Sequence, residues 1–158
     1  MRKVLAAFVL AAALIAPSLA LAGQVVAFGG YNAGTIIVET NARRLFYVLG
    51  NGQAIQYPVG VGRAGMAWHG RAYVAQKLVR PAWTREPGVT PTIPGGSSRN
   101  PMGEAVLGLD RGNYAIHGTN DPSSIGGFVS HGCIRMYNAD IVDLYRRVGI
   151  GTEVYVLR

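Results

Sequence analysis

The chain has 158 residues, and its 15 Lys and Arg against 8 Asp and Glu give a formal net charge of +7. This length fits one domain with a hydrophobic core and is too short for two domains that each bury a core of their own. The basic residues are spread along the chain and form no run, which indicates ordinary solvated charges or weak attraction to an anionic polymer or membrane surface, and we expect no nucleic-acid partner.

The first residues have the parts of an export signal. Arg2 and Lys3 supply positive charge, and the run VLAAFVLAAALIAPSLALA that follows is apolar and ends in small residues. An uncleaved membrane anchor is the alternative, because the run approaches the ~20 residues that span a bilayer. Pro17 interrupts the run, and we therefore favour a cleaved signal.

The small-residue ending places the cleavage site. Cleavage after Ala22 fits the pattern Ala-Leu-Ala, and cleavage after Ala20 stays open. We predict a signal peptide over residues 1–22 and a mature domain over residues 23–158. The mature domain would lie in the periplasm or cell envelope without a stable membrane anchor. It would keep 13 basic against 8 acidic side chains, a net charge of +5.

Short strands are predicted in the first part of the mature domain. Residues 35–40 and 44–49 are rich in β-branched and aromatic side chains, with a turn between them. Asn51-Gly52 is a strong hairpin signal and leads into the strand-like run AIQYPVGVG. We predict a meander of at least three strands over residues 34–62.

The middle of the chain is harder to assign. Residues 63–100 mix strand-like pieces with Gly and Pro, and residues 90–101 are a predicted loop. A loop this long in a small domain is often a lid or the wall of a cleft, although a plain surface loop is the alternative. Two strands are predicted at 105–109 and 113–118, the second ending at His117.

One helix is predicted in NADIVDLYRRVG. Asn138 is its candidate N-cap and Gly149 its C-terminal stop. The run TEVYVLR then closes the chain as a strand, which makes the domain mainly β with one short helix. The helix prediction depends on an i, i+3, i+4, i+7 apolar stripe, formed by Ile141, Leu144, Tyr145 and Val148.

The only cysteine, Cys133, lies in GFVSHGCIRMYN. A lone cysteine in an exported protein either forms a disulfide with another chain, fills space in the core, or is reactive. A reactive thiol needs a group such as histidine to remove its proton. His131 would share a strand face with Cys133 unless Gly132 bends the chain. His117 would approach Cys133 if the loop TNDPSSIGG folds back.

Plainer alternatives exist for each of these residues. A histidine near a strand end is more often structural, and Arg135 would ordinarily be a surface ion-pairing residue. His69, beside Trp68, has no evident partner in the sequence and is interpreted as structural. The three histidines and the cysteine match no common zinc-ligand spacing, so we predict no metal site.

The joint pattern YAIHGTNDPSSIGGFVSHGCIRMYNADIVDLY, residues 114–145, resembles the signature of the L,D-transpeptidase (YkuD-type) catalytic domain. It contains His117-Gly118-Thr119 and a Ser-His-Gly-Cys-Ile-Arg-Met run ending at Met136. Weaker similarity covers nearly all of the mature chain, including PAW, NPMG and GTEVYVLR. The family often has Thr-Pro-x-Gly-x-Phe where this chain has MAWHGRAY, a departure that affects the wall of the cleft and substrate preference.

The resemblance implies a mixed β-sandwich with a helix after the catalytic loop, and a cysteine transpeptidase of cell-wall biogenesis. Cys133 would attack the carbonyl before the terminal D-alanine of a peptidoglycan stem tetrapeptide and form a thioester. An amine of a neighbouring stem would resolve it into a 3-3 cross-link. An outer-membrane lipoprotein lysine, a free D-amino acid or water are alternative acceptors, and no metal or organic cofactor is implied.

The resemblance also implies residue roles. His117 would be the acid and base, oriented by the backbone carbonyl of Gly118. The amides of Gly132 and Cys133 are candidates for an oxyanion hole.

Three further residues would support the site. Ser130 belongs to the motif, and His131 would shape the site and not act as its base. Arg135 would either grip a substrate carboxylate or brace the loop.

Other activities are also weighed. An L,D-carboxypeptidase or a peptidoglycan–lipoprotein hydrolase would use the same residues, with water as acceptor. A non-catalytic wall-binding module is disfavoured because Cys133 and His117 are both present. An NlpC/P60-like peptidase is disfavoured because its cysteine precedes its histidine. The resemblance further implies acylation of Cys133 by carbapenem-type β-lactams.

Overall fold

The computed structural model describes residues 23–158, so the predicted signal peptide lies outside the described residues. No helix in this described part is long and apolar enough to cross a membrane. The elements follow in this order: β1 (Gln24–Ala27), β2 (Ile36–Glu39), β3 (Arg44–Gly50), β4 (Gln53–Pro58), β5 (Val61–Gly62), β6 (Gly70–Val79), β7 (Ala105–Leu109), β8 (Ala115–His117), η1 (Pro122–Ser124), β9 (Phe128–Ser130), β10 (Ile134–Arg135), α1 (Asn138–Arg147) and β11 (Glu153–Leu157).

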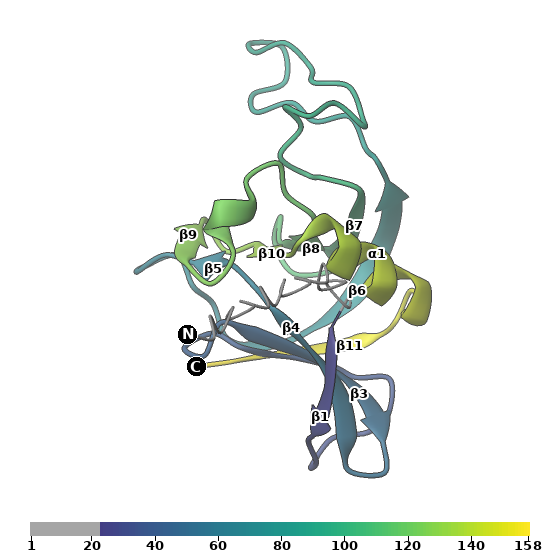
Figure 1. The fold of residues 1–158 in the computed structure, drawn as a ribbon. Coiled ribbons are helices and arrows are strands. Elements are labelled where there is room, and N and C mark those ends of the chain that lie inside the picture. The colour runs from purple at the N-terminus through teal and green to yellow at the C-terminus, as the bar shows by residue number, and fades with distance from the viewer. Residues whose placement is uncertain (1–22) are drawn as a thin grey trace, which may run out of the picture.

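Nine strands form one mixed sheet in the order β1-β4-β3-β2-β11-β6-β7-β8-β10, and β5 pairs with β9 beside it. The pairs β11–β2, β10–β8 and β5–β9 are parallel. The long strand β6 connects the β1–β11 part of the sheet with the β7–β10 part, because its first residues pair with β11 and its later residues pair with β7. In Figure 1, β1 and β3 lie at the bottom, β7 and β8 lie higher near α1, and β5 and β9 lie together at the left. The prediction of a mainly β, mixed-sheet domain with one α-helix is confirmed.

The predicted meander is also confirmed. Strands β2, β3 and β4 are antiparallel neighbours. At the β3–β4 turn, Asn51 has φ 51° and Gly52 has φ 72°. Both residues are therefore left-handed, as the favoured two-residue hairpin turn requires.

Strand β6 was not assigned from the sequence, although it is the longest strand described. Its core face carries the buried Ala72 and Val74, but further along Lys77 interrupts the apolar pattern. The Lys77 ammonium donates hydrogen bonds to the carbonyl oxygens of Tyr145 (2.8 Å) and Val148 (2.6 Å) at the end of α1. A cation there satisfies carbonyls that the helix leaves unpaired.

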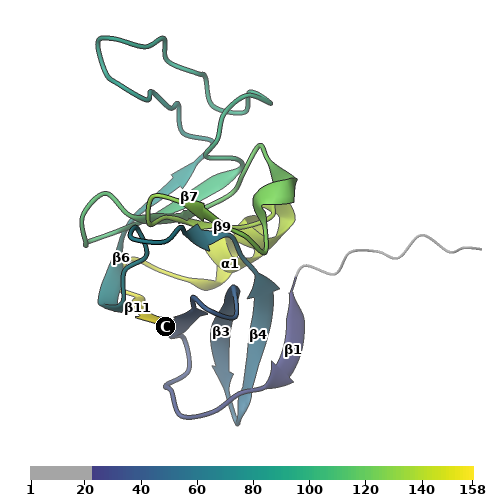
Figure 2. The same ribbon diagram turned by 90° about the vertical axis from the view of Figure 1, so that its left-hand side faces the viewer.

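Between β6 and β7, residues 80–104 form an extended loop that projects from the body of the domain (Figures 1 and 2). The predicted loop over residues 90–101 lies within it and contains no strand or helix. Trp83 and Ile93 exchange two backbone hydrogen bonds, 2.9 and 2.7 Å long, across its base. The side-chain amide of Asn100, which is 1% exposed, donates to the carbonyl oxygen of Pro81 at 2.8 Å.

Helix α1 packs its apolar stripe, including the fully buried Ile141 and Leu144, against the sheet. The prediction of Asn138 as N-cap is wrong, because Tyr137 occupies that position and Asn138 is the first helical residue. The reason is tertiary: the Asn138 side chain bonds to the backbone of two other loops and not to the helix.

Candidate active site

Parallel pairing of β8 and β10 brings the two halves of the motif together. His117, the last residue of β8, is in register with Arg135 of β10, and Ile116 is in register with Ile134. Cys133 directly precedes Ile134, and His117 directly follows Ile116, so this pairing brings the backbones of the two motif halves side by side.

The His117 side chain is buried and has a defined tautomer. The residue is 3% exposed, and its Nδ1 lies 2.6 Å from the carbonyl oxygen of Gly118. A carbonyl oxygen only accepts, so Nδ1 carries the hydrogen and Nε2 keeps its lone pair. Burial lowers the pKa of His117 to about 4 and the charge of Arg135 lowers it further, against the opposing effect of the Gly118 and Pro101 carbonyls. His117 is therefore a neutral base at neutral pH.

The Cys133 thiol is also neutral at rest. Burial raises its pKa, while a hydrogen bond from the Ala115 amide and the charge of Arg135 lower it by less. The thiol donates to the carbonyl oxygen of Asn113 at 3.8 Å. Within residues 23–158, the thiol and the imidazole hydrogen-bond to backbone groups and not to each other. Proton transfer between them thus requires the thiol to turn away from Asn113.

Ser130 holds the loop in front of Cys133. Its buried hydroxyl accepts a hydrogen bond from the Gly132 amide at 3.0 Å and donates to the Cys133 carbonyl at 2.5 Å. The Gly132 amide is therefore engaged. Among the hydrogen bonds of the described residues, the Cys133 amide has no acceptor, and it is the freer of the two candidate oxyanion donors.

Gly132 bends the chain between His131 and Cys133. Its φ is 123°, and a side chain at this position would overlap the ring of Tyr114. The shared-face relation considered for His131 and Cys133 therefore does not hold. Instead, Nε2 of His131 lies 2.6 Å from Nη2 of Arg63, and it accepts from the guanidinium, which only donates.

Trp68 is a site residue that sequence reasoning missed. Its indole Nε1 donates to the carbonyl oxygen of Gly132 at 2.9 Å. Its ring stacks on Tyr114 with 5.2 Å between ring centroids and 3° between planes, and Arg111 lies over the Trp68 ring. The segment MAWHGRAY, where the chain departs from the usual motif, thus supports the catalytic loop. The sequence signal for Trp68 was the residue type itself, because the N–H of a packed indole usually donates to an acceptor nearby.

Asn138 ties the residues after His117 in place. Its Oδ1 accepts from the amides of Glu104 and Thr119, both at 3.2 Å, and its Nδ2 donates to the Thr119 carbonyl at 3.0 Å. A side chain at Gly118 would overlap Asn138 Oδ1. Asn138 therefore fixes the segment whose carbonyl orients His117.

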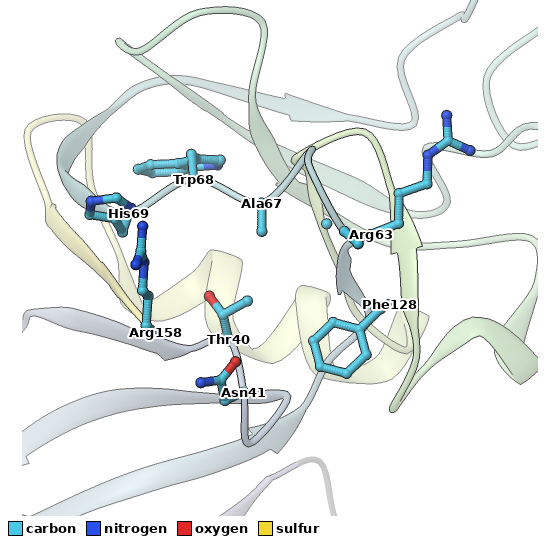
Figure 3. A pocket seen from close by; sticks show the side chains of 10 residues that line it. Thr40, Asn41, Arg63, Ala67, Trp68, His69, Phe128 and Arg158 are labelled. Atoms are coloured by element: carbon cyan, nitrogen blue, oxygen red, sulfur yellow. The ribbon is translucent and has the colours of Figure 1, made fainter.

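A cavity of about 430 Å³ adjoins the loop on the side of Trp68 (Figure 3). Its wall carries the Arg158 side chain, the imidazole of His69 and the aromatic rings of Trp68 and Phe128, with no acidic side chain, whereas the Arg63 side chain starts at its edge and points away from it. The sequence had offered no partner for His69, and the structure places it on this wall. The cavity is suited to an anionic ligand with an apolar part.

Metal chemistry has no obvious site in this part of the molecule. Across residues 23–158, no group of three or more His, Cys, Asp or Glu side chains is positioned to hold a metal ion. Cys133 is a free cysteine. The arrangement of a partly buried thiol, a neutral imidazole and an unengaged amide fits nucleophilic acyl transfer.

Comparison with known proteins points in the same direction. A family model described as the L,D-transpeptidase catalytic domain, YkuD, matches residues 33–156. YqjB of Bacillus subtilis (strain 168), assigned as an L,D-transpeptidase, is 35% identical over 127 residues, covering 77% of this chain and 69% of YqjB. YbiS of Escherichia coli (strain K12), assigned likewise, is 36% identical over 137 residues, covering 77% of this chain and 43% of YbiS.

Solved structures share the fold. A crystal structure of a mutant Enterococcus faecium L,D-transpeptidase aligns with TM-score 0.64 at 20% identity, covering 80% of this chain and 50% of that one. L,D-transpeptidase 3 of Mycobacterium tuberculosis, with a faropenem-derived adduct, aligns with TM-score 0.61 at 17% identity, covering 78% and 60%. This chain spans half of the Enterococcus chain and less than half of YbiS.

Proposed function

Because the chain belongs to the L,D-transpeptidase catalytic-domain family of cysteine enzymes, we propose that it releases the terminal D-alanine of a peptidoglycan stem tetrapeptide and transfers the remaining acyl group to an amine. The pairing of β8 with β10 supports this proposal, because β8 ends at His117 and β10 begins directly after Cys133, and burial lowers the pKa of His117 and so favours its neutral form. Transfer to a neighbouring stem gives a 3-3 cross-link, and transfer to a lipoprotein lysine attaches that lipoprotein.

In the first half-reaction, the Cys133 thiol gives its proton to Nε2 of His117 as its sulfur attacks the scissile carbonyl carbon. The resulting oxyanion accepts a hydrogen bond from the Cys133 amide. Collapse breaks the C–N bond, and the leaving D-alanine amine takes the proton back from His117. A thioester on Cys133 remains. In the second half-reaction, the acceptor amine attacks the thioester, passes a proton through His117 to the sulfur, and restores the thiol.

The electrostatics favour a neutral pair over a standing ion pair. Burial holds His117 neutral and raises the pKa of Cys133, so charge is created during the reaction. The Arg135 guanidinium lies near enough to act on both pKa values. It takes part in none of the ion pairs among the described residues. This supports the proposal that Arg135 receives a substrate carboxylate.

The basic cavity gives the substrate a second anchoring point. Stem peptides carry carboxylates, and Arg158 lies on the cavity wall, whose lining has no acidic side chain, with Arg63 at the edge. Trp68 connects the cavity to the catalytic loop through its bond to Gly132. We assign the cavity to a carboxylate-bearing part of a stem peptide, beyond the scissile bond.

Export is part of the proposal. The charged start, apolar run and small-residue ending of residues 1–22 support a cleaved signal and a periplasmic or cell-envelope location. Cell fractionation with the chain carrying Arg2→Asp and Lys3→Asp checks this, because these changes are expected to keep the protein out of the exported fraction. Unchanged export of that variant would contradict a signal at this end of the chain.

The test of activity is mass spectrometry of the exported chain incubated with a disaccharide-tetrapeptide. Wild type should release D-alanine and form a 3-3 dimer, whereas Cys133→Ala and His117→Ala should do neither. Arg85→Ala is the control, because that exposed side chain lies on the projecting loop outside the cavity lining, and it should retain the reaction. Tripeptide without dimer would identify an L,D-carboxypeptidase. No reaction with the tetrapeptide but cleavage of a lipoprotein-linked muropeptide would identify the hydrolase.

A further inference from the structure

The buried carboxyl group of Asp140 is not used by the proposed mechanism. Asp140 lies in the first turn of α1 and is 6% exposed. It takes part in none of the ion pairs within residues 23–158. Carboxylates are seldom this buried unless they are paired. Asp140 therefore lacks a counter-charge in the described part of the chain.

The neighbouring charges do not supply one. Asp143, one turn further along α1, adds repulsion. Arg147 is held by Asp143 through two contacts of 3.0 and 2.8 Å, and the hydroxyl of Tyr57 donates to Asp143 at 2.6 Å. A surface hollow beside Asp140 is lined by Gly23, Arg44 of β3, Tyr137 and Arg147 among others, with Asp143 and Tyr57 adjoining, and Arg44 takes part in none of the ion pairs within residues 23–158.

Gly23 and Asp140 line the same hollow, and a hydrogen bond from the backbone N–H of Gly23 lowers the pKa of the Asp140 carboxyl. Figure 2 shows the start of β1 beside α1. Gly23 has φ 70°, and any side chain there would overlap Ile55 and Tyr57. The packing thus demands glycine at this position and directs its nitrogen to Asp140.

Gly23 is also the first residue after the predicted cleavage site. Cleavage after Ala22 would convert its N–H into an ammonium group, a full positive charge on the atom that already contacts the carboxyl. Cleavage after Ala20 would leave Leu21-Ala22 attached and keep the nitrogen an uncharged amide. Cleavage after Ala22 therefore gives the Asp140 carboxylate a positively charged partner, and cleavage after Ala20 does not.

We propose that the Ala22–Gly23 bond is the processing site of this chain and that the carboxylate of Asp140 binds the ammonium group which processing creates on Gly23. This inference rests on the export part of the proposed function. Processing hydrolyses the peptide bond with one water, leaving a carboxylate on Ala22 and the ammonium on Gly23. Because Asp140 is two residues from Asn138, the ion pair anchors the end of α1 that holds the catalytic loops.

The pH dependence follows from the same contact. Burial, with repulsion from Asp143, raises the pKa of Asp140 to about 6 from 3.8, against the lowering effect of the Gly23 N–H. A folded pKa above the unfolded value means that stability falls as pH rises from 3.8 to about 6. An adjacent ammonium lowers the folded pKa, so the processed chain keeps its stability at neutral pH.

Two measurements test the proposal. The full chain is produced in an exporting host, and the first residue of the exported protein is read by mass spectrometry. We expect Gly23, and a chain beginning at Leu21 would overturn the proposal. Separately, one alanine is inserted between Ala22 and Gly23, so that cleavage after Ala22 leaves the ammonium one residue away from Asp140. The melting temperature at pH 7 should fall by roughly 5 °C.

The same insertion is made in the Asp140→Asn variant as a control. The insertion should have no such effect there, because the counter-charge is absent. Equal melting with and without the insertion, or the same loss in Asp140→Asn, would overturn the proposal. If Asp140→Asn does not fold, the pH series decides: the difference in melting temperature between wild type and insertion should shrink as the pH falls below 7 and the carboxyl takes up a proton, and a difference independent of pH would overturn the proposal. None of these readouts uses a peptidoglycan substrate, so failure of the proposed activity would be seen separately.

Discussion

Two ionisable side chains, His117 at the end of β8 and Asp140 in the first turn of α1, are both buried, but they have different partners and different roles. Burial disfavours the charged form of each, lowering one pKa to about 4 and raising the other to about 6. His117 donates to a fixed backbone carbonyl, so its neutral form is both stable and useful as a base. Asp140 accepts from a backbone N–H whose charge depends on processing. The difference shows that the partner, and not burial alone, decides what a buried ionisable group can do.

Removing the imidazole should have the largest effect. His117→Asn is expected to lower kcat/KM for D-alanine release by more than ~10³-fold, because the base and acid are lost together. Steady-state kinetics of the purified variant check this, with circular dichroism to confirm that it folds. Residual activity within tenfold of wild type would contradict the role of His117.

The His117→Asn variant also tests whether the buried imidazole is neutral, through the pH dependence of stability. The folded pKa of His117, about 4, lies below the unfolded 6.5, so the unfolded chain binds a proton first as the pH falls. Wild type should lose about 3 kcal/mol of stability between pH 6.5 and 4 relative to His117→Asn. Urea unfolding at a series of pH values measures the difference between the two proteins. Parallel curves would contradict a neutral, buried His117.

Gly118→Ala should disturb the carbonyl that orients His117. The new methyl group would overlap Asn138 Oδ1 and crowd the backbone of Glu104. We expect kcat to fall roughly 100-fold with a smaller change in KM, since a displaced base impairs the reaction more than binding. Gly149→Ala, at a position with open space around it, is the control and should leave kcat unchanged.

Trp68→Phe should have a moderate effect on the catalytic loop. Phenylalanine keeps an aromatic ring against Tyr114 but removes the indole donor to the Gly132 carbonyl. We expect a loss of about 1 kcal/mol in stability and roughly tenfold in kcat. Thermal melting and kinetics measure both. A variant equal to wild type in both would show that this bond does not position the loop.

Arg63→Gln should have the smallest effect and should appear mainly in KM. The change removes one positive charge beside the edge of the cavity and weakens the contact with His131. We expect KM for the tetrapeptide to rise severalfold at low salt, with kcat within twofold of wild type, and the rise to shrink at high salt. Arg85→Gln is a control on the projecting loop, outside the cavity lining. A rise in KM independent of salt would contradict a charge effect.

Much of the architecture was predictable because its signals are local. Asn51-Gly52 specifies its hairpin through backbone preferences of two residues, and the apolar stripe of α1 follows from helical periodicity. Strand β6 escaped prediction because Lys77 interrupts its pattern, and the reason for a lysine there lies in carbonyl groups at the end of α1. A strand residue selected by a distant helix has no local signature.

The sequence by itself determined the fold class, the motif around Cys133 and the neighbouring His117, because residue types and spacing are local properties of the chain. Only the tertiary structure decided which groups those residues meet. It turned His131 toward Arg63, occupied the Gly132 amide with Ser130, and directed the nitrogen of Gly23 to Asp140. Backbone amides and carbonyls are the same at every position, so their partners depend on register and loop geometry, which no short stretch of sequence encodes.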